Sequence, residues 1–254
     1  MIRPRVIPAL LLKGQGLVKT VRFKEPRYLG DPINIVRIFN DKEVDELIFL
    51  DITATNEKRR PPFEMLGKIT GECFMPLGYG GGIRSLEDVR TLLGLGIEKV
   101  ILNTAAVEMP DLVGQVADYA GSQAVVISMD VKRNLLGKYE VFIHSGRQGT
   151  GLDPVRHAQE MERRGAGELF VNSIDRDGTM QGYDLDLIRR VAEAVSIPVI
   201  ACGGAGNLQH LAEAIQAGAS AAAAGSLFVF QGPLRGVLIS YPSREELGRL
   251  RLAD

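Results

Sequence analysis

Short apolar runs recur along the chain, and stretches with the apolar spacing of helices separate them. Each run is four to eight residues long, and most are apolar throughout instead of alternating with polar residues. Such runs are typical of parallel strands that are buried on both faces. The pattern predicts eight strands, at 6–12, 47–52, 75–79, 100–103, 124–129, 169–174, 197–201 and 219–224.

The segments between these runs have the periodicity of amphipathic helices. In the segment at 85–96, Ser85 and Asp88 have the spacing of a capping box. Similar helical patterns occupy 184–195 and 207–218. Eight strands with helices between them in about 250 residues predict a (βα)8 barrel. A doubly wound sheet is the alternative, but it usually has fewer strands at this length.

The second half of the chain repeats the first at a constant offset of 122 residues. The offset persists from the second predicted strand to the fourth, which argues against chance. The sequence therefore predicts two half-barrels, roughly 1–120 and 121–254, that close as one domain. The matched pairs include Asp31-Pro32 with Asp153-Pro154, Pro76 with Pro198, Gly81-Gly82 with Gly203-Gly204, and Gly96 with Gly218.

Composition removes several function classes. The 254 residues are 45% hydrophobic and carry a formal net charge of −1, so no basic excess indicates a nucleic-acid partner. No apolar run approaches the ~20 residues of a membrane span, and no secretory signal is apparent. Cys73 and Cys202 lack the spacing of a metal site or a disulfide. We therefore expect a cytoplasmic protein without metal or cofactor.

Two glycine-rich segments occupy equivalent places in the repeat. GYGGGIRS at 78–85 follows the third predicted strand, and IACGGAGN at 200–207 follows the seventh. Glycines there could simply make tight turns, but exposed backbone N–H groups before a helix also attract phosphate. A small molecule phosphorylated at both ends would suit two such cradles. The predicted phosphate-binding residues are Gly81, Gly82, Asn103 and Thr104 in one cradle, and Gly203, Gly204, Gly225 and Ser226 in the other.

The first and fifth strands match each other at an offset of 119, with one disagreement. Val6 falls on Val125, Leu10 on Met129 and Lys13 on Lys132. Leu11, however, stands where the other copy has Asp130. A carboxylate at a strand end can act as a general acid or base, whereas leucine cannot exchange a proton.

Several longer segments together resemble the HisF family, the cyclase subunit of imidazole glycerol phosphate synthase. The resemblance extends over essentially the whole chain. It implies a (βα)8 barrel that takes ammonia from a glutaminase partner at its N-terminal face. The ammonia would pass through the barrel to a lyase and ring-closure reaction of a bisphosphate at the C-terminal face. The segments that carry the resemblance are FLDITA (49–54), GGGIRSLED (80–88), TGLDP (150–154), FVNSIDRDGTMQGYD (170–184) and SIPVIACGGAG (196–206).

The chain departs from the family pattern at the reaction site. The family uses two aspartates; Asp130 matches the second, and Leu11 replaces the first. Thr104 stands where serine is common, and Asn172 where threonine is common. Segments 10–20 and 229–247 resemble a HisF-like subgroup. Its members accompany a HisH-like glutaminase and an ATP-dependent sugar amidotransferase in making amidino sugars for surface polysaccharide.

Four charged residues stand at or next to the starts of predicted strands, namely Arg5, Glu46, Lys99 and Glu168. Charges at strand starts are common on protein surfaces. Two bases and two acids at one end of a barrel could also pair into a plug. The resemblance implies that these four form the gate of the ammonia passage.

The segment 13–30 is predicted as a long basic loop, which could be a solvated loop or a lid over an anionic ligand. Lys19 matches the lysine of the mobile loop in the family and is the candidate lid residue. Asp51 and the 175–177 segment are expected to shape the pocket. The histidines, His144, His157 and His210, are expected to be structural or surface residues.

Three functions remain open on the sequence alone. The chain could be a HisF-like subunit that channels ammonia from a HisH-like glutaminase for sugar amidation. It could be a genuine cyclase subunit of histidine biosynthesis that tolerates Leu11. It could also be a non-catalytic scaffold that activates the glutaminase.

Overall fold

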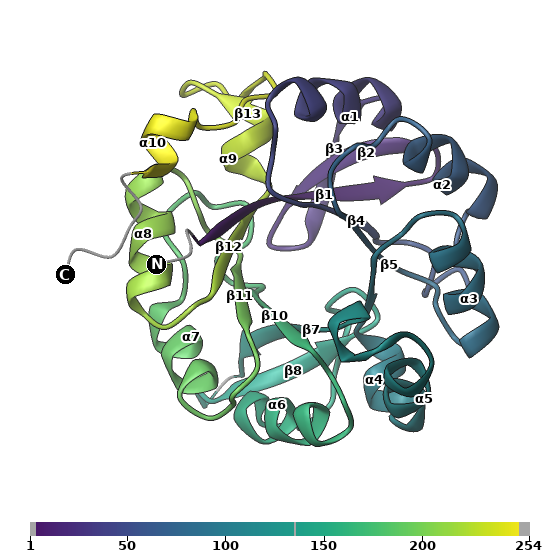
Figure 1. Cartoon of the computed structure of the whole chain (residues 1–254). Coiled ribbons are helices and arrows are strands. Elements are labelled where there is room, and N and C mark those ends of the chain that lie inside the picture. Colours follow the sequence, from purple (N-terminus) through teal and green to yellow (C-terminus); the bar gives the residue numbers. More distant parts are fainter. Residues whose placement is uncertain (1–3, 135, 249–254) are drawn as a thin grey trace.

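The computed structural model describes residues 4–134 and 136–248, and it shows a closed barrel of parallel strands surrounded by helices (Figure 1). The last strand pairs in parallel with the first, which closes the sheet. The predicted (βα)8 barrel is therefore confirmed, and the doubly wound alternative is excluded. The barrel strands are β1 (Arg5–Lys13), β4 (Leu47–Asp51), β5 (Leu77–Gly80), β6 (Lys99–Leu102), β7 (Val125–Arg133), β10 (Glu168–Ser173), β11 (Val199–Cys202) and β12 (Ala221–Ala224).

Helices cover the outside of the barrel, and equivalent helices of the two halves begin in the same way. Asp31 and Asp153 each cap a helix that starts with proline, and each carboxylate accepts a hydrogen bond from the first turn. Ser85 forms the predicted capping box with Asp88. The helices are α1 (Pro32–Asp41), α2 (Phe63–Thr70), α3 (Leu86–Gly94), α4 (Thr104–Glu108), α5 (Asp111–Ala120), α6 (Pro154–Arg163), α7 (Leu185–Ala192), α8 (Leu208–Gln216), α9 (Ser226–Val229) and α10 (Arg244–Gly248), with a 3-10 turn at Ser122–Ala124.

No helix within residues 4–134 and 136–248 is both long and apolar enough to cross a membrane.

The alternation of side chains along each strand decides what fills the barrel and what lies at its two ends. On β1, Ile7 and Ala9 belong to the apolar cluster inside the barrel, while Arg5 precedes them and Leu11 follows them on the same face. A separate and larger core packs between the strands and the helices. Each inward position is therefore assigned to the floor, the interior or the mouth of the barrel by its place in the strand.

Hairpins extend from the barrel at the ends of the strands. The predicted loop at 13–30 is wrong: β2 (Gly16–Val21) and β3 (Lys24–Gly30) form an antiparallel hairpin that continues β1. Its backbone pairs with β1, and the buried side chains of Leu17 and Val18 give it a core. A second hairpin adds β8 (Tyr139–Ile143) and β9 (Gln148–Gly149) to β7.

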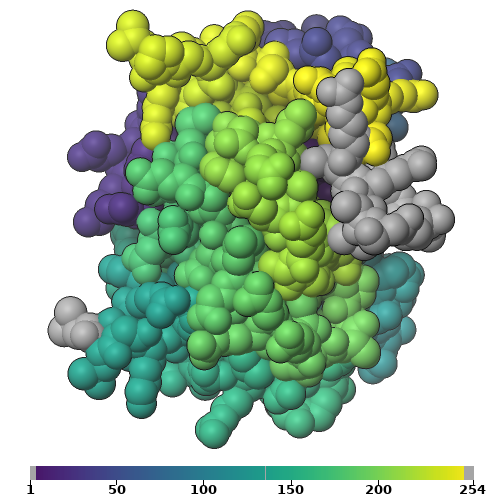
Figure 2. Space-filling view, turned by 90° about the vertical axis from the view of Figure 1, so that its left-hand side faces the viewer, coloured from purple at the N-terminus to yellow at the C-terminus, as the bar shows by residue number. Residues whose placement is uncertain are grey.

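The last part of the chain runs from one end of the barrel to the other. A small hairpin of β13 (Phe230–Gln231) and β14 (Gly236–Val237) is tied to the mouth, where Arg235 donates hydrogen bonds to two carbonyls after β10. Tyr241 then donates to the carbonyl of Val6 near the start of β1. In the side view of Figure 2 the purple β2–β3 hairpin stands on the left and the bright yellow α10 on the right, at opposite ends of the barrel.

Candidate functional site

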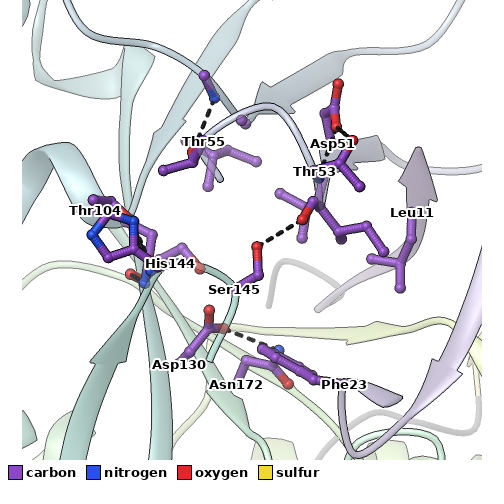
Figure 3. Close-up of a pocket in the computed structure, with 18 of the residues that line it drawn as sticks. Leu11, Phe23, Asp51, Thr53, Thr55, Thr104, Asp130, His144, Ser145 and Asn172 are labelled. Carbon is purple, nitrogen blue, oxygen red and sulfur yellow. Dashed lines mark hydrogen bonds between the residues drawn. The ribbon is translucent and has the colours of Figure 1, made fainter. Parts of the chain in front are cut away.

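The carboxyl ends of the strands open into a cavity of about 710 Å³. Parallel barrels place their reaction sites at this end, because the loops after all eight strands converge there. Leu11, Asp51, Asp130 and Asn172 lie around this cavity in Figure 3, and each comes from a different strand.

Asp130 is the candidate proton-exchanging group of the cavity. It lies on β7 and is only 9% exposed. Its pKa is raised to about 7, chiefly because burial disfavours the charged form; a hydrogen bond from the side-chain amide of Asn172 at 3.2 Å opposes the rise, and the nearby charge of Asp177 adds to it. A carboxyl group with this pKa can give or take a proton near neutral pH.

Leu11 lies across the cavity from Asp130 (Figure 3). Its place in β1, opposite Leu50 of β4, turns its side chain into the mouth of the barrel. An apolar side chain therefore stands where a paired carboxylate would have to be. Asp130 faces a wall with no proton donor or acceptor at that position.

Asp51, which is expected to shape the pocket, lines the cavity and orders the loop after β4. One of its carboxylate oxygens accepts hydrogen bonds from the backbone of Thr53 and Ala54 and from the Thr53 hydroxyl, at 3.0–3.1 Å. Ser145, which the sequence reading missed, donates to the carbonyl of Ile52 at 2.8 Å. The loops after β4 and β8 thereby brace each other across the cavity wall.

The first predicted cradle opens into the cavity. Gly81 and Gly82 have φ of +121° and +72°, and a side chain at either would collide with backbone atoms. The Thr104 hydroxyl accepts from the backbone N–H of His144 at 3.0 Å, and the Asn103 amide donates to two carbonyls of β7 and β8. All four predicted residues of this cradle line the cavity.

The second cradle is more enclosed than the first. Gly203 and Gly204 also have positive φ, but of its four predicted residues Gly225 is the one that lines the cavity. The stem of Lys19 lies against Gly225, 2.9 Å from where a Cβ would stand. The hydroxyl of Ser226 is buried and has no hydrogen-bond partner among the residues described.

The side chain of Lys19 is fixed at the barrel mouth by hydrogen bonds. Its ammonium group donates to both carboxylate oxygens of Asp177, at 2.9 and 3.0 Å, and to the carbonyl of Thr20 at 3.0 Å. Lys19 and Asp177 are both buried. Because Lys19 lies on β2 and Asp177 follows β10, this ion pair fastens the hairpin across the barrel mouth.

The four predicted gate charges meet at the opposite end of the barrel. Lys99 contacts both oxygens of Glu46 at 3.0 Å and Glu168 at 2.8 Å. Arg5 bridges the same two carboxylates. The result is a closed ring of alternating charge, in which the side chain of Glu46 is 3% exposed and that of Arg5 is 30% exposed. The convergence that the sequence predicts is present.

Apolar side chains separate the ring from the cavity. The inward positions of the barrel include Ile7, Ile48, Val126, Phe170 and Ile200. Such an interior disfavours ions and strongly hydrated species, because burying an unpaired charge is costly. The two ends of the barrel are thus polar, and the interior between them is apolar.

The two cysteines and the three histidines lie in the following surroundings. Cys73 and Cys202 are free thiols, and burial raises the pKa of Cys202. His144 contacts Glu108 at 3.0 Å, His157 is buried, and His210 accepts from the backbone of Gly206. Within residues 4–134 and 136–248 no group of three His, Cys, Asp or Glu side chains could hold a metal ion.

Comparison with known proteins places the chain in a family. The family described as "Histidine biosynthesis protein" matches residues 5–234. A Pseudomonas aeruginosa protein named "Putative imidazole glycerol phosphate synthase subunit hisF2" is 52% identical over 248 residues, which cover 97% of this chain and 99% of the relative. A Leptospira interrogans protein named "Putative imidazole glycerol phosphate synthase subunit HisF" is 47% identical, over 97% of this chain and 98% of the relative.

A third relative carries the same subunit name without the word "Putative". The "Imidazole glycerol phosphate synthase subunit HisF" of Alkaliphilus metalliredigens is 47% identical over 229 residues, or 90% of this chain and 91% of the relative. The family match at residues 5–234 includes all eight barrel strands. The chain therefore belongs to the HisF family.

Proposed function

We propose that this chain is the synthase-side subunit of a glutamine-dependent ammonia-transfer complex, in which the cyclase reaction of the family has been lost. Ammonia enters through the charged ring, crosses the apolar interior and reaches an acceptor at the cavity. The observation that carries the proposal is the pairing of a complete ring at one end of the barrel with Leu11 at the other.

The ring is the part that a chain with no ammonia to carry would not need. Replacing a buried ion-pair cluster with well-packed apolar residues is often neutral or stabilising, so stability alone does not account for it. A ring that closes the floor keeps water and hydronium out of the interior. Ammonia that meets no water stays unprotonated, and only the neutral form suits an apolar passage.

The partner on the floor side is a HisH-like glutaminase. Its product has to be released directly against the ring, so the glutaminase docks over Arg5, Glu46, Lys99 and Glu168. This gives a heterodimer in which glutamine hydrolysis takes place outside the barrel and nitrogen transfer takes place at its mouth.

The proposed loss of cyclisation follows from the residues at the barrel mouth. Asp130 can exchange a proton near neutral pH, but Leu11 supplies no second group. Removing one general acid or base commonly costs about 10²–10⁴ in rate. We assign Asp130 to proton exchange with the ammonia or its acceptor.

The ligand at the mouth is a phosphorylated small molecule. The first cradle presents Gly81, Gly82, Asn103 and Thr104 to the cavity. In the second, the buried hydroxyl of Ser226 has no partner among the residues that the structure describes. A phosphate oxygen could accept its hydrogen bond, which matters because a buried polar group without a hydrogen bond is costly.

The acceptor is a sugar for surface polysaccharide, activated by an ATP-dependent amidotransferase. Support comes from the resemblance of segments 10–20 and 229–247 to the HisF-like subgroup with that role. The family match ends at residue 234, so β14 and the segment that follows it, including α10, lie outside the general family pattern.

Reconstitution with the co-encoded glutaminase tests the proposal. We expect the intact complex to form glutamate and amidated acceptor in equal amounts. Lys99→Ala opens the ring, so glutamate should form in excess while ammonia escapes to solvent. Lys68→Ala is the matched control, because Lys68 pairs with Glu64 on the exposed face of α2.

The alternatives give different outcomes in the same assay. A ratio unaffected by Lys99→Ala, or the absence of any complex with the glutaminase, contradicts the conduit. Cyclase turnover with ammonia within tenfold of an ordinary family member identifies a genuine cyclase. Stimulated glutaminase without transfer to any acceptor identifies a scaffold.

A further inference from the structure

The side chain of Asn172 lies between Asp130 and the second cradle. Its amide nitrogen donates to Asp130 at 3.2 Å. Its carbonyl oxygen points to Gly203, only 2.6 Å from where a Cβ would stand. The glycine is thus required by Asn172 as well as by the turn, and one side chain connects the carboxyl group to the cradle.

The carbonyl oxygen of Asn172 is in an unfavourable place. It is buried, and it accepts no hydrogen bond from any residue that the structure describes. An oxygen turned toward an anion cradle would also repel the phosphate that the cradle is proposed to hold. The hydroxyl of Ser226, another member of the predicted second cradle, is also buried and has no hydrogen-bond partner among the described residues. These two polar groups, without partners among the described residues, indicate that the second cradle binds a ligand when the protein is active.

An exchange of the two ends of the amide removes both difficulties. Amide oxygen and nitrogen have nearly the same shape, so the rotation needs no repacking. The oxygen would then face Asp130 and the NH2 group would face the cradle. A carbonyl oxygen facing Asp130 requires that Asp130 carry a proton to donate.

We propose that Asn172 is a positioning residue that couples the protonation of Asp130 to anion binding in the second cradle. With Asp130 protonated, the acid donates to the Asn172 oxygen, and the Asn172 NH2 group donates to the anion. With Asp130 ionised, Asn172 donates to the carboxylate and presents an oxygen that repels the anion. The inference rests on the phosphate-binding part of the proposed function.

The surroundings of Asp130 permit this exchange. Its burial keeps the pKa near 7, so both forms are accessible. The ionisable groups around it are Asp177 after β10, the Lys19 of β2 that pairs with Asp177, and the thiol of Cys202 on β11. The thiol remains neutral because its pKa is raised. A ligand phosphate bound in this way keeps Asp130 in its protonated, neutral form, with a proton available for transfer.

Sulfate is the probe, since it stays a dianion at every pH used, whereas phosphate itself titrates near pH 7. Binding is followed from pH 6.5 to 8.5 by the NMR shifts of the backbone amides of Gly204 in the second cradle and Gly82 in the first. If binding needs protonated Asp130, the dissociation constant at Gly204 should rise about 25-fold over this range, because the protonated fraction falls by that factor.

Two variants separate the coupling from simple repulsion. Asp130→Asn keeps a hydrogen-bond donor and carries no charge, so binding at Gly204 should stay tight at every pH. Asn172→Val leaves the Asp130 charge but removes the amide. Its sulfate affinity at Gly204 should be weak and nearly independent of pH, while unchanged binding at Gly82 shows that the fold is intact.

Each outcome decides between defined alternatives. Sulfate binding at Gly204 that does not depend on pH in the unaltered protein overturns the coupling and leaves the proposed function intact. A pH dependence that persists in Asn172→Val assigns the effect to repulsion by Asp130 alone and also overturns it. Sulfate that shifts neither amide, or that binds without specificity as an adventitious ion only, contradicts the phosphate cradles themselves.

Discussion

Replacing Leu11 with aspartate tests whether one residue removed the cyclase chemistry. Leu11 is partly buried at the cavity wall, opposite Asp130. Fully burying a leucine contributes about 1.5–3 kcal/mol, so a partly buried one costs about 1 kcal/mol when it becomes polar. That loss lowers the melting temperature by roughly 2–4 °C, and the barrel should remain folded.

The gain in rate should be much larger than this loss in stability. A missing general acid or base accounts for about 10²–10⁴ in turnover, or about 3–5 kcal/mol of barrier. Ammonia-dependent cyclase turnover with the bisphosphate substrate should therefore be negligible in the unaltered protein and rise by that factor in Leu11→Asp. Leu11→Asn is the control, since it has the same shape without a proton to exchange.

The partnership with Asp130 supplies a second criterion. Asp130→Asn should abolish the recovered turnover in Leu11→Asp, yet have little effect on cyclase turnover in the unaltered protein. If Leu11→Asn recovers as much activity as Leu11→Asp, the missing carboxylate is not the cause. If the unaltered protein already turns over at an ordinary rate, the loss of cyclisation is wrong.

Three further results are expected. Lys99→Met should lower the free energy of unfolding by about 1–3 kcal/mol in urea titrations, because it leaves Glu46 with one partner in a largely buried ring, whereas Lys68→Met should change it by less than about 0.5 kcal/mol; equal effects would contradict the importance of the ring. Saturating sulfate, at about 100 times its dissociation constant, should add about 2.7 kcal/mol of stability, and Ser226→Ala should reduce this protection; no protection in either protein would contradict the cradles. Because the pKa of Asp130 is raised to about 7, its contribution to stability is full below about pH 4 and is lost as the pH rises to 7. The free energy of unfolding of Asp130→Asn, relative to that of the unaltered protein, should therefore increase by about 2–3 kcal/mol from pH 5 to pH 8, and a constant difference would contradict this.

The sequence predicts the barrel and both of its ends because the deciding signals are local. An apolar run such as 6–12 identifies a buried strand. The two-residue period of side chains along a strand puts Arg5 and Leu11 on the same face, one at its start and the other toward its end. The offset of the repeat then pairs equivalent turns in the two halves. The position of four charged residues at or next to strand starts permits a ring at one end of the barrel, but the choice of a ring over unrelated surface charges came from the family resemblance.

The sequence does not predict features that depend on contacts between distant segments. The basic residues of the 13–30 segment predict a loop, and no local pattern reveals that Val18 pairs with Leu11 in a hairpin. The partner of Lys19 is 158 residues away, so no local pattern indicates that its ammonium group is buried. The sequence shows Asn172 as a departure from the family pattern, but only the structure shows that its buried oxygen lies against Gly203 and has no partner among the described residues.

The most direct test of the conduit follows the nitrogen atom itself. The reconstituted complex is supplied with glutamine labelled with ¹⁵N in its side-chain amide, in the presence of excess unlabelled ammonium, and the amidated product is analysed by mass spectrometry. If ammonia crosses the barrel behind the ring of Arg5, Glu46, Lys99 and Glu168, the product carries ¹⁵N despite the external pool, and Lys99→Ala lets the unlabelled nitrogen in. A product from the intact complex whose label is already diluted to the composition of the bulk ammonium would contradict the account.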